Sequence, residues 1–242
     1  MGFLLFFHGI HFCTMIGSDS HERAYLGPFF VFLVFLLLVD VVARLGDGYS
    51  HWMLAAPRYW IFPLQTAVCA VLLWRWRQHY TFRPFHGWLT ALAIGAGALI
   101  LWIAPQCWFG AAPRMEGFDP GYFGAGGAAY TINLTLRITR MVIIVPLVEE
   151  IFWRGWLLRY LINDDFQKVP FGAFTWKSFL ISSAAFCIEH QMADWPAAIL
   201  TGAAFNLVAY RTKSLAACVL THAVTNAGLA IYILQTRQWG FW

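Results

Sequence analysis

Seven residues in the second half of the chain have types and spacings suited to acid–base chemistry. They form three short groups: Glu149, Glu150 and Arg154; Phe186 and His190; and His222 and Asn226. A carboxylate with few water contacts is suited to take a proton from water, and an imidazole can help by orienting that water. An imidazole and a carboxamide one turn apart can both donate to the oxygen that becomes negative when a peptide carbonyl is attacked. The pattern predicts peptide hydrolysis, with Glu149 and His190 acting on water and His222 and Asn226 on the oxyanion.

Glu150 and Arg154 differ from the other residues because they can neutralise each other. They lie four positions apart with the acid on the N-terminal side, an arrangement that stabilises a helix. We therefore expect a structural ion pair that supports the site. Glu149 is rotated by about 100° from Glu150 on a helix. Its partners must come from other segments.

The segments that carry these residues are apolar enough to cross a bilayer. The 242 residues are 60% hydrophobic and 12% charged, which is about half the charged fraction of a soluble domain. Apolar runs occur at residues 3–16, 28–45, 60–74, 87–104, 134–158, 178–190, 197–210 and 214–234. The sequence predicts an all-α polytopic membrane bundle of about eight transmembrane helices, the run at 3–16 either spanning or lying in the interface. We expect one membrane domain over residues 1–242, with N-terminal helices in 1–130 and a core in 131–234 that carries the three groups.

The helical rise places the four reactive side chains at a similar depth. Counted at about 1.5 Å per residue from the basic residues at the helix ends, they lie about 14 to 20 Å deep. The hydrocarbon core is about 30 Å thick, so all four converge near its middle. Pro146 removes one internal hydrogen bond, which in an α-helix frees the carbonyl of Val142. We therefore expect a bend one turn before Glu149 that could admit water.

At these residues the chain resembles the type II CAAX prenyl proteases and their bacterial relatives, the CPBP or Abi group of intramembrane glutamic endopeptidases. Their motifs EExxxR, FxxxH and HxxxN correspond to residues 149–154, 186–190 and 222–226, in the same order. The resemblance covers about residues 131–232. It implies an intramembrane endopeptidase in which Glu149, with His190, activates water and the third motif stabilises the oxyanion.

From residue 145 to the end of the sequence the chain is similar to a bacterial subgroup, the CAAX prenyl protease-related proteins associated with exosortase systems. This similarity implies a multi-pass protein of the bacterial inner membrane. It also makes C-terminal sorting tails a candidate substrate.

The expected partners are the lipid bilayer and a membrane-associated protein or peptide substrate. We expect no nucleic acid, no cofactor and no metal, and the oligomeric state is left open. Two alternatives remain. Glu149, His190 and His222 could form a zinc set with two imidazoles and one carboxylate, although no HExxH pair anchors it. The chain could also be a non-catalytic immunity or assembly factor that keeps the pocket only as structure.

Overall fold

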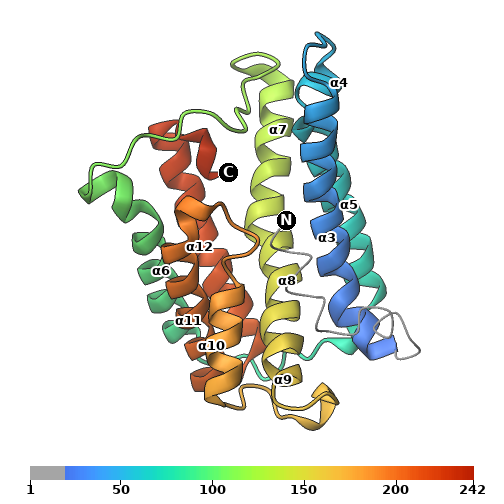
Figure 1. Ribbon diagram of the computed structural model, residues 1–242, viewed down its shortest axis with the longest axis vertical. Coiled ribbons are helices and arrows are strands. Elements are labelled where there is room, and N and C mark those ends of the chain that lie inside the picture. The colour runs from blue at the N-terminus through green and yellow to red at the C-terminus, as the bar shows by residue number, and fades with distance from the viewer. Residues whose placement is uncertain (1–19) are drawn as a thin grey trace.

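The computed structural model describes residues 20–242, which form helices and loops and contain no strand. Six separate helices and one interrupted helix run roughly along its long axis (Figure 1). The separate helices are α3 (Ser20–Leu45), α5 (Arg58–Arg75), α6 (Trp88–Trp108), α10 (Trp176–Ala185), α11 (Trp195–Thr212) and α12 (Leu215–Thr236). The interrupted helix contains α7 (Gly127–Thr139), a π-helical segment (Arg140–Ile144), α8 (Val145–Glu150), a second π-helical segment (Ile151–Leu157) and α9 (Leu158–Tyr160). A short helix, α4 (Trp52–Ala55), precedes α5.

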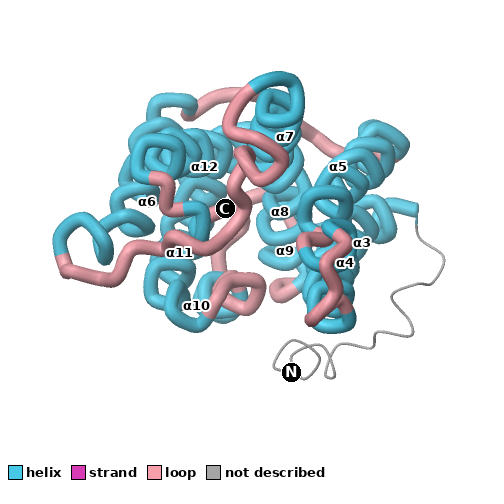
Figure 2. The backbone as a smooth tube through the Cα atoms, turned by 90° about the horizontal axis from the view of Figure 1, so that it is seen from above, coloured by secondary structure: helices cyan, strands magenta, loops and turns pink. Residues whose placement is uncertain are grey.

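The interrupted helix occupies the middle of the bundle. Figure 2 shows α6, α10, α11 and α12 on one side of it and α3, α4 and α5 on the other. The helix that carries the EExxxR motif therefore contacts both halves. On the α3 side, the rings of Phe29 and Phe152 stack with their centroids 3.8 Å apart.

Four helical segments are long and apolar enough to cross a membrane, namely Ser20–Leu45, Trp88–Trp108, Gly127–Tyr160 and Leu215–Thr236. The predicted all-α membrane bundle is confirmed, and a helix lies at each of the seven apolar runs predicted from residue 28 onward. The run at 3–16 lies outside the described residues. Whether the shorter helices also span the bilayer stays a prediction.

Polar groups lie inside the bundle and apolar side chains lie outside. Val34 and Leu37 of α3 are both 63% exposed, whereas Gln65, Glu150 and Asn206 are fully buried. A charged or amide side chain is costly in hydrocarbon and is retained where it finds partners or performs chemistry. The arrangement is that of a protein whose outer surface faces lipid.

A proline changes the backbone just before α8. In the first π-helical segment the N–H of Val145 donates to the carbonyl of Arg140, five residues earlier. The same pattern would pair residue 146 with Met141, but Pro146 has no N–H. The carbonyl left free by this pattern is therefore that of Met141, not that of Val142 as expected for a regular α-helix.

The helix predicted at residues 178–190 is shorter than expected. It ends at Ala185, and residues 186–189 continue as turns before a bend at His190. The N–H groups of Ile188 and His190 there donate to carbonyls three residues earlier. The FxxxH motif thus lies in a turn and not on a helix.

Helices α6 and α12 approach each other closely at a glycine. The Thr225 hydroxyl donates to the carbonyl of Gly95 over 3.0 Å. A Cβ atom added at Gly95 would lie 2.7 Å from the carbonyl oxygen of Thr221, a backbone atom that cannot turn away. This contact sets the position of α12, which carries the HxxxN motif.

Replacing Gly95 by Ala is expected to destabilise the protein by about 1–3 kcal/mol, because overpacking forces two helices apart. Thermal unfolding in detergent measures the effect. The matched control is Gly97→Ala on the same helix, since no atom lies within 4 Å of an added Cβ there. If Gly95→Ala unfolded at the same temperature as Gly97→Ala or higher, the close approach of the two helices would be wrong.

Candidate active site

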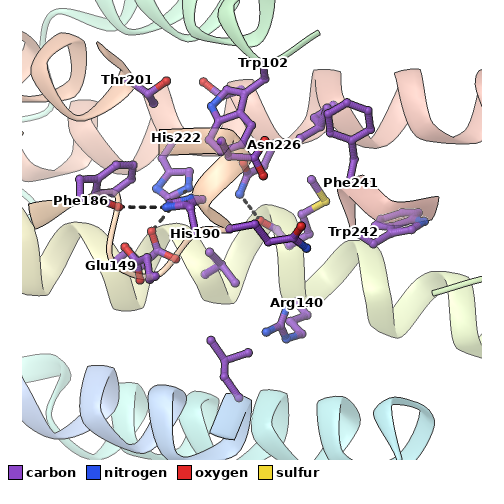
Figure 3. Close-up of a pocket in the computed structure, with 18 of the residues that line it drawn as sticks. Trp102, Arg140, Glu149, Phe186, His190, Thr201, His222, Asn226, Phe241 and Trp242 are labelled. Carbon is purple, nitrogen blue, oxygen red and sulfur yellow. Dashed lines mark hydrogen bonds and ion pairs between the residues drawn. The ribbon is translucent and has the colours of Figure 1, made fainter. Parts of the chain in front are cut away.

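One cavity of about 240 Å³ is lined by all four residues that the sequence predicts to carry the chemistry. Glu149 lies near the end of α8, His190 in the turn after α10, and His222 and Asn226 on α12. Figure 3 shows their side chains gathered around this cavity. The structure therefore brings together groups that are up to 77 positions apart, from 149 to 226, in the sequence.

Glu149 and His222 lie side by side in the buried part of the cavity. Glu149 is 5% exposed and His222 is 6% exposed. The Nε2 atom of the imidazole lies 4.0 Å from a carboxylate oxygen of Glu149. This distance is too long for a hydrogen bond, so in this arrangement the two groups act on each other through their charges.

The other ring nitrogen of His222 is held by Glu150. Its Nδ1 atom lies 2.9 Å from Oε1 of Glu150, which also accepts a hydrogen bond of 2.9 Å from Arg154. The expected Glu150–Arg154 ion pair is thus present, and its side chains are completely buried. Because a carboxylate paired with a guanidinium only accepts hydrogen bonds, Nδ1 carries the hydrogen. A second proton on Nε2 would give an imidazolium that the Glu150 carboxylate stabilises.

Arg154 connects the helix that carries the EExxxR motif to α11 and, through α11, to α10. Its Nε donates to the Asn206 amide oxygen over 3.0 Å, and a terminal nitrogen donates to the carbonyl of Gly202 over 3.1 Å. The Asn206 amide in turn donates to the Ser183 hydroxyl on α10. Sequence reasoning missed Asn206, although a single amide within the apolar run at 197–210 was a usable signal.

His190 is oriented by the backbone of its own turn. Its Nδ1 lies 2.9 Å from the carbonyl oxygen of Phe186. A carbonyl only accepts, so Nδ1 carries the hydrogen and Nε2 of the neutral ring is an acceptor. The Trp102 ring packs against the imidazole with centroids 5.1 Å apart. The FxxxH spacing thus allows both the carbonyl and the aromatic ring of Phe186 to position His190.

Asn226 is fixed by the carbonyl that Pro146 leaves free. Its Nδ2 donates to the Met141 oxygen over 2.8 Å. A carboxamide nitrogen has two hydrogens, so the second remains available for a substrate oxygen. The proline before α8 and the HxxxN motif are therefore parts of one arrangement.

Glu189 is a cavity residue that sequence reasoning did not single out. One of its carboxylate oxygens accepts a hydrogen bond of 2.8 Å from the Trp153 indole, and the other is buried without a partner in the described part of the chain. The signal was present, because a carboxylate within an apolar run marks a functional position as readily here as at Glu149.

Within residues 20–242, no group of three His, Cys, Asp or Glu side chains is arranged to hold a metal ion. His190 and His222 both use Nδ1 in the contacts above, which leaves their Nε2 atoms toward the cavity side. The zinc alternative therefore has to be tested by experiment.

Comparison with protein families gives a match to one model, described as "Type II CAAX prenyl endopeptidase Rce1-like", over residues 131–228. Comparisons with curated proteins and with solved structures found no match. The matched region contains all three motifs, so the predicted resemblance to the CAAX protease family is confirmed. It indicates a peptidase in a membrane. The association with exosortase systems stays a prediction.

Proposed function

We propose, from the membership of residues 131–228 in the type II CAAX prenyl endopeptidase family, that the protein hydrolyses a peptide bond within the membrane by using Glu149 and a water molecule. The observation that supports this proposal best is the single cavity shared by Glu149, His190, His222 and Asn226. Three separate segments contribute these groups. A mechanism that uses these four groups needs no Ser or Cys nucleophile.

In the first step Glu149 takes one proton from water as the water oxygen bonds to the peptide carbonyl carbon. The other water hydrogen is held by Nε2 of His190, which is free to accept because Nδ1 faces the Phe186 carbonyl. The carbonyl π electrons move to the oxygen, which becomes an oxyanion. Glu149 then returns its proton to the amide nitrogen as the carbon–nitrogen bond breaks.

The oxyanion is stabilised by Asn226 and His222. Asn226 donates through the amide hydrogen that Met141 does not use. His222 donates from Nε2 in its imidazolium form, whose charge is offset by Glu150 at Nδ1. Donors fixed before the reaction stabilise the developing charge without reorganisation.

The substrate is a membrane-associated protein or peptide, and C-terminal sorting tails of the bacterial inner membrane are the candidate class. A proteomic comparison of a wild-type strain with a Glu149→Gln strain tests the proposal. We expect a membrane precursor to accumulate in the variant and its cleaved form to disappear. Full complementation of a deletion strain by Glu149→Gln would favour the non-catalytic alternative.

The zinc alternative is tested separately on purified protein. The proposed mechanism predicts turnover that survives exhaustive chelation, in protein shown to contain no zinc. Loss of turnover on chelation, with recovery on adding zinc, would instead assign Glu149, His190 and His222 to a metal.

Replacing Asn226 by Ala is expected to lower kcat by about 100- to 1000-fold, the usual effect of losing one oxyanion donor. Substrate binding should change much less, because the donor acts mainly on the transition state. The measurement is steady-state cleavage, with thermal unfolding as the control for the lost Met141 contact. A change confined to KM would show that Asn226 binds substrate and does not stabilise the oxyanion.

A further inference from the structure

A second cavity, separate from the catalytic one, has a basic lining. Its volume of about 380 Å³ is within the range of small-molecule sites, and it shares no lining residue with the catalytic cavity. Its cationic residues are Arg83, Arg159 and Lys213, and the imidazoles of His21 and His79 also line it. No Asp or Glu is among the described residues that form its wall. The cavity is therefore positively charged.

The three cations have no carboxylate partner in the described part of the chain. None of them forms an ion pair with a residue from 20 to 242. Asp165, in the loop after α9, pairs instead with Lys168, and Glu22 of α3 does not line the cavity. Arg159 interacts with the phenol of Tyr25, which is uncharged at neutral pH. Like charges around a cavity without a counter-charge favour the binding of an anion.

Backbone carbonyls hold two of the cations in position. Nε of Arg159 donates to the carbonyl of Val169 over 2.8 Å, and a terminal nitrogen donates to the carbonyl of Gly155 over 3.0 Å. Nζ of Lys213 donates to the carbonyl of Gly172. Both side chains have more N–H groups than these contacts use. The two charges are thus fixed before a ligand arrives, and N–H donors remain to bind it.

The cavity lies at the level of the membrane surface. Three of the four segments that are long and apolar enough to cross a membrane begin or end beside it, because His21, Arg159 and Leu215 lie at their ends and line the cavity. Figure 1 shows α9 and the start of α3 together at the lower end of the bundle. Phospholipid headgroups lie at the boundary of the hydrocarbon core. Basic pockets between helices at this level bind anionic headgroups.

We propose that this cavity binds a phosphate group through Arg83, Arg159 and Lys213. Phosphate oxygens accept charge-assisted hydrogen bonds from guanidinium and ammonium groups. The level of the cavity favours an anionic phospholipid headgroup as the source of the phosphate, and free phosphate from solution is the other source. The bound phosphate links the connection before α6, the end of the interrupted helix and the turn before α12. The site does not depend on the proposed peptidase function.

Equilibrium binding to the full-length protein in a neutral detergent tests the site. The probes are radiolabelled dioctanoyl phosphatidic acid and dioctanoylglycerol, which have the same acyl chains and differ in the phosphate. We expect phosphatidic acid to bind about 10- to 100-fold more tightly, the usual effect of hydrogen bonds to a charged group. Arg159→Gln and Lys213→Gln should each weaken its binding about fivefold or more, and should leave the binding of dioctanoylglycerol unchanged.

The matched control is Lys177→Gln, since Lys177 is exposed in the first turn of α10 and does not line the cavity. It removes the same charge as Lys213→Gln and should keep the preference for phosphatidic acid. Equal binding of the two probes, or an equal loss in Lys177→Gln, would overturn the site and leave the proposed cleavage intact. If Arg159→Gln does not fold, Lys213→Gln still decides the result, because Lys213 is exposed.

Competition with inorganic phosphate distinguishes the two sources. Displacement of phosphatidic acid by an equal concentration of inorganic phosphate would identify free phosphate as the ligand. Retention of phosphatidic acid would identify the lipid headgroup, the result that we expect from the level of the cavity. Either result supports a phosphate site, provided that Lys213→Gln weakens the binding.

Discussion

Replacing Glu149 by Gln is expected to abolish peptide-bond cleavage while the protein remains folded. Glutamine keeps the shape of the side chain but cannot take a proton from water. Loss of a general base lowers rates by about 100- to 10,000-fold, and here the same group also returns the proton to the leaving nitrogen. The loss of activity in this variant should therefore lie near the upper end of that range, about 10,000-fold, or the activity should fall below detection.

Cleavage of a reconstituted membrane substrate by purified protein measures this effect, with elution profile and thermal unfolding as evidence of folding. Glu116→Gln is the matched control, because Glu116 is exposed and does not line the cavity. It should retain wild-type activity. Turnover by Glu149→Gln at more than about one tenth of the wild-type rate would contradict the assignment.

The second large effect concerns stability and involves the buried Glu150–Arg154 pair. Replacing Arg154 by Met leaves the Glu150 carboxylate without its cation in an interior where both side chains are completely buried. Breaking one partner of a buried pair typically destabilises a protein by about 3–5 kcal/mol. Arg154→Met should therefore unfold at a much lower temperature or fail to accumulate.

The double variant Glu150→Gln with Arg154→Met separates stability from catalysis. It removes both charges, so much of the lost stability should return. Activity should not return, because the uncharged glutamine side chain would no longer offset a positive charge on His222. Lys168→Met is the control, since Lys168 and Asp165 form an exposed pair that should contribute little. Wild-type activity in the double variant would show that Glu150 only supports the helix.

The sequence was sufficient to predict the bundle and the residues that meet in it. Runs of apolar residues and the high cost of a charge in lipid identify the helices and the unusual position of Glu149. The spacings of His222 with Asn226 and of Glu150 with Arg154 specify which side chains share a helix face. These are local properties, and the periodicity of residue types along the sequence indicates them directly.

Contacts between distant segments could not be predicted in the same way. Glu150 was expected to pair within its own helix, yet it also contacts His222, which lies 72 positions later. The end of α10 at Ala185 was missed because residues 186–190 contain no proline or glycine to mark a helix end. Arg140 lacked a visible role because only the folded cavity shows that it lies in the same pocket as Glu149.

The π-helical segments on either side of α8 make the catalytic helix sensitive to its exact residue count. Each holds a wider turn than an α-helix, and such turns are usually less stable. Deleting one residue from Arg140–Ile144 would let a regular helix form and would keep the preceding turns nearly in phase with Glu149, because the π-helical turn holds one residue more than an α-helical turn. The shortened chain would gain a more regular backbone but would lose the wide turn whose carbonyls lie beside Asn226. Length variation in a family alignment should accordingly fall in the loops and spare this stretch.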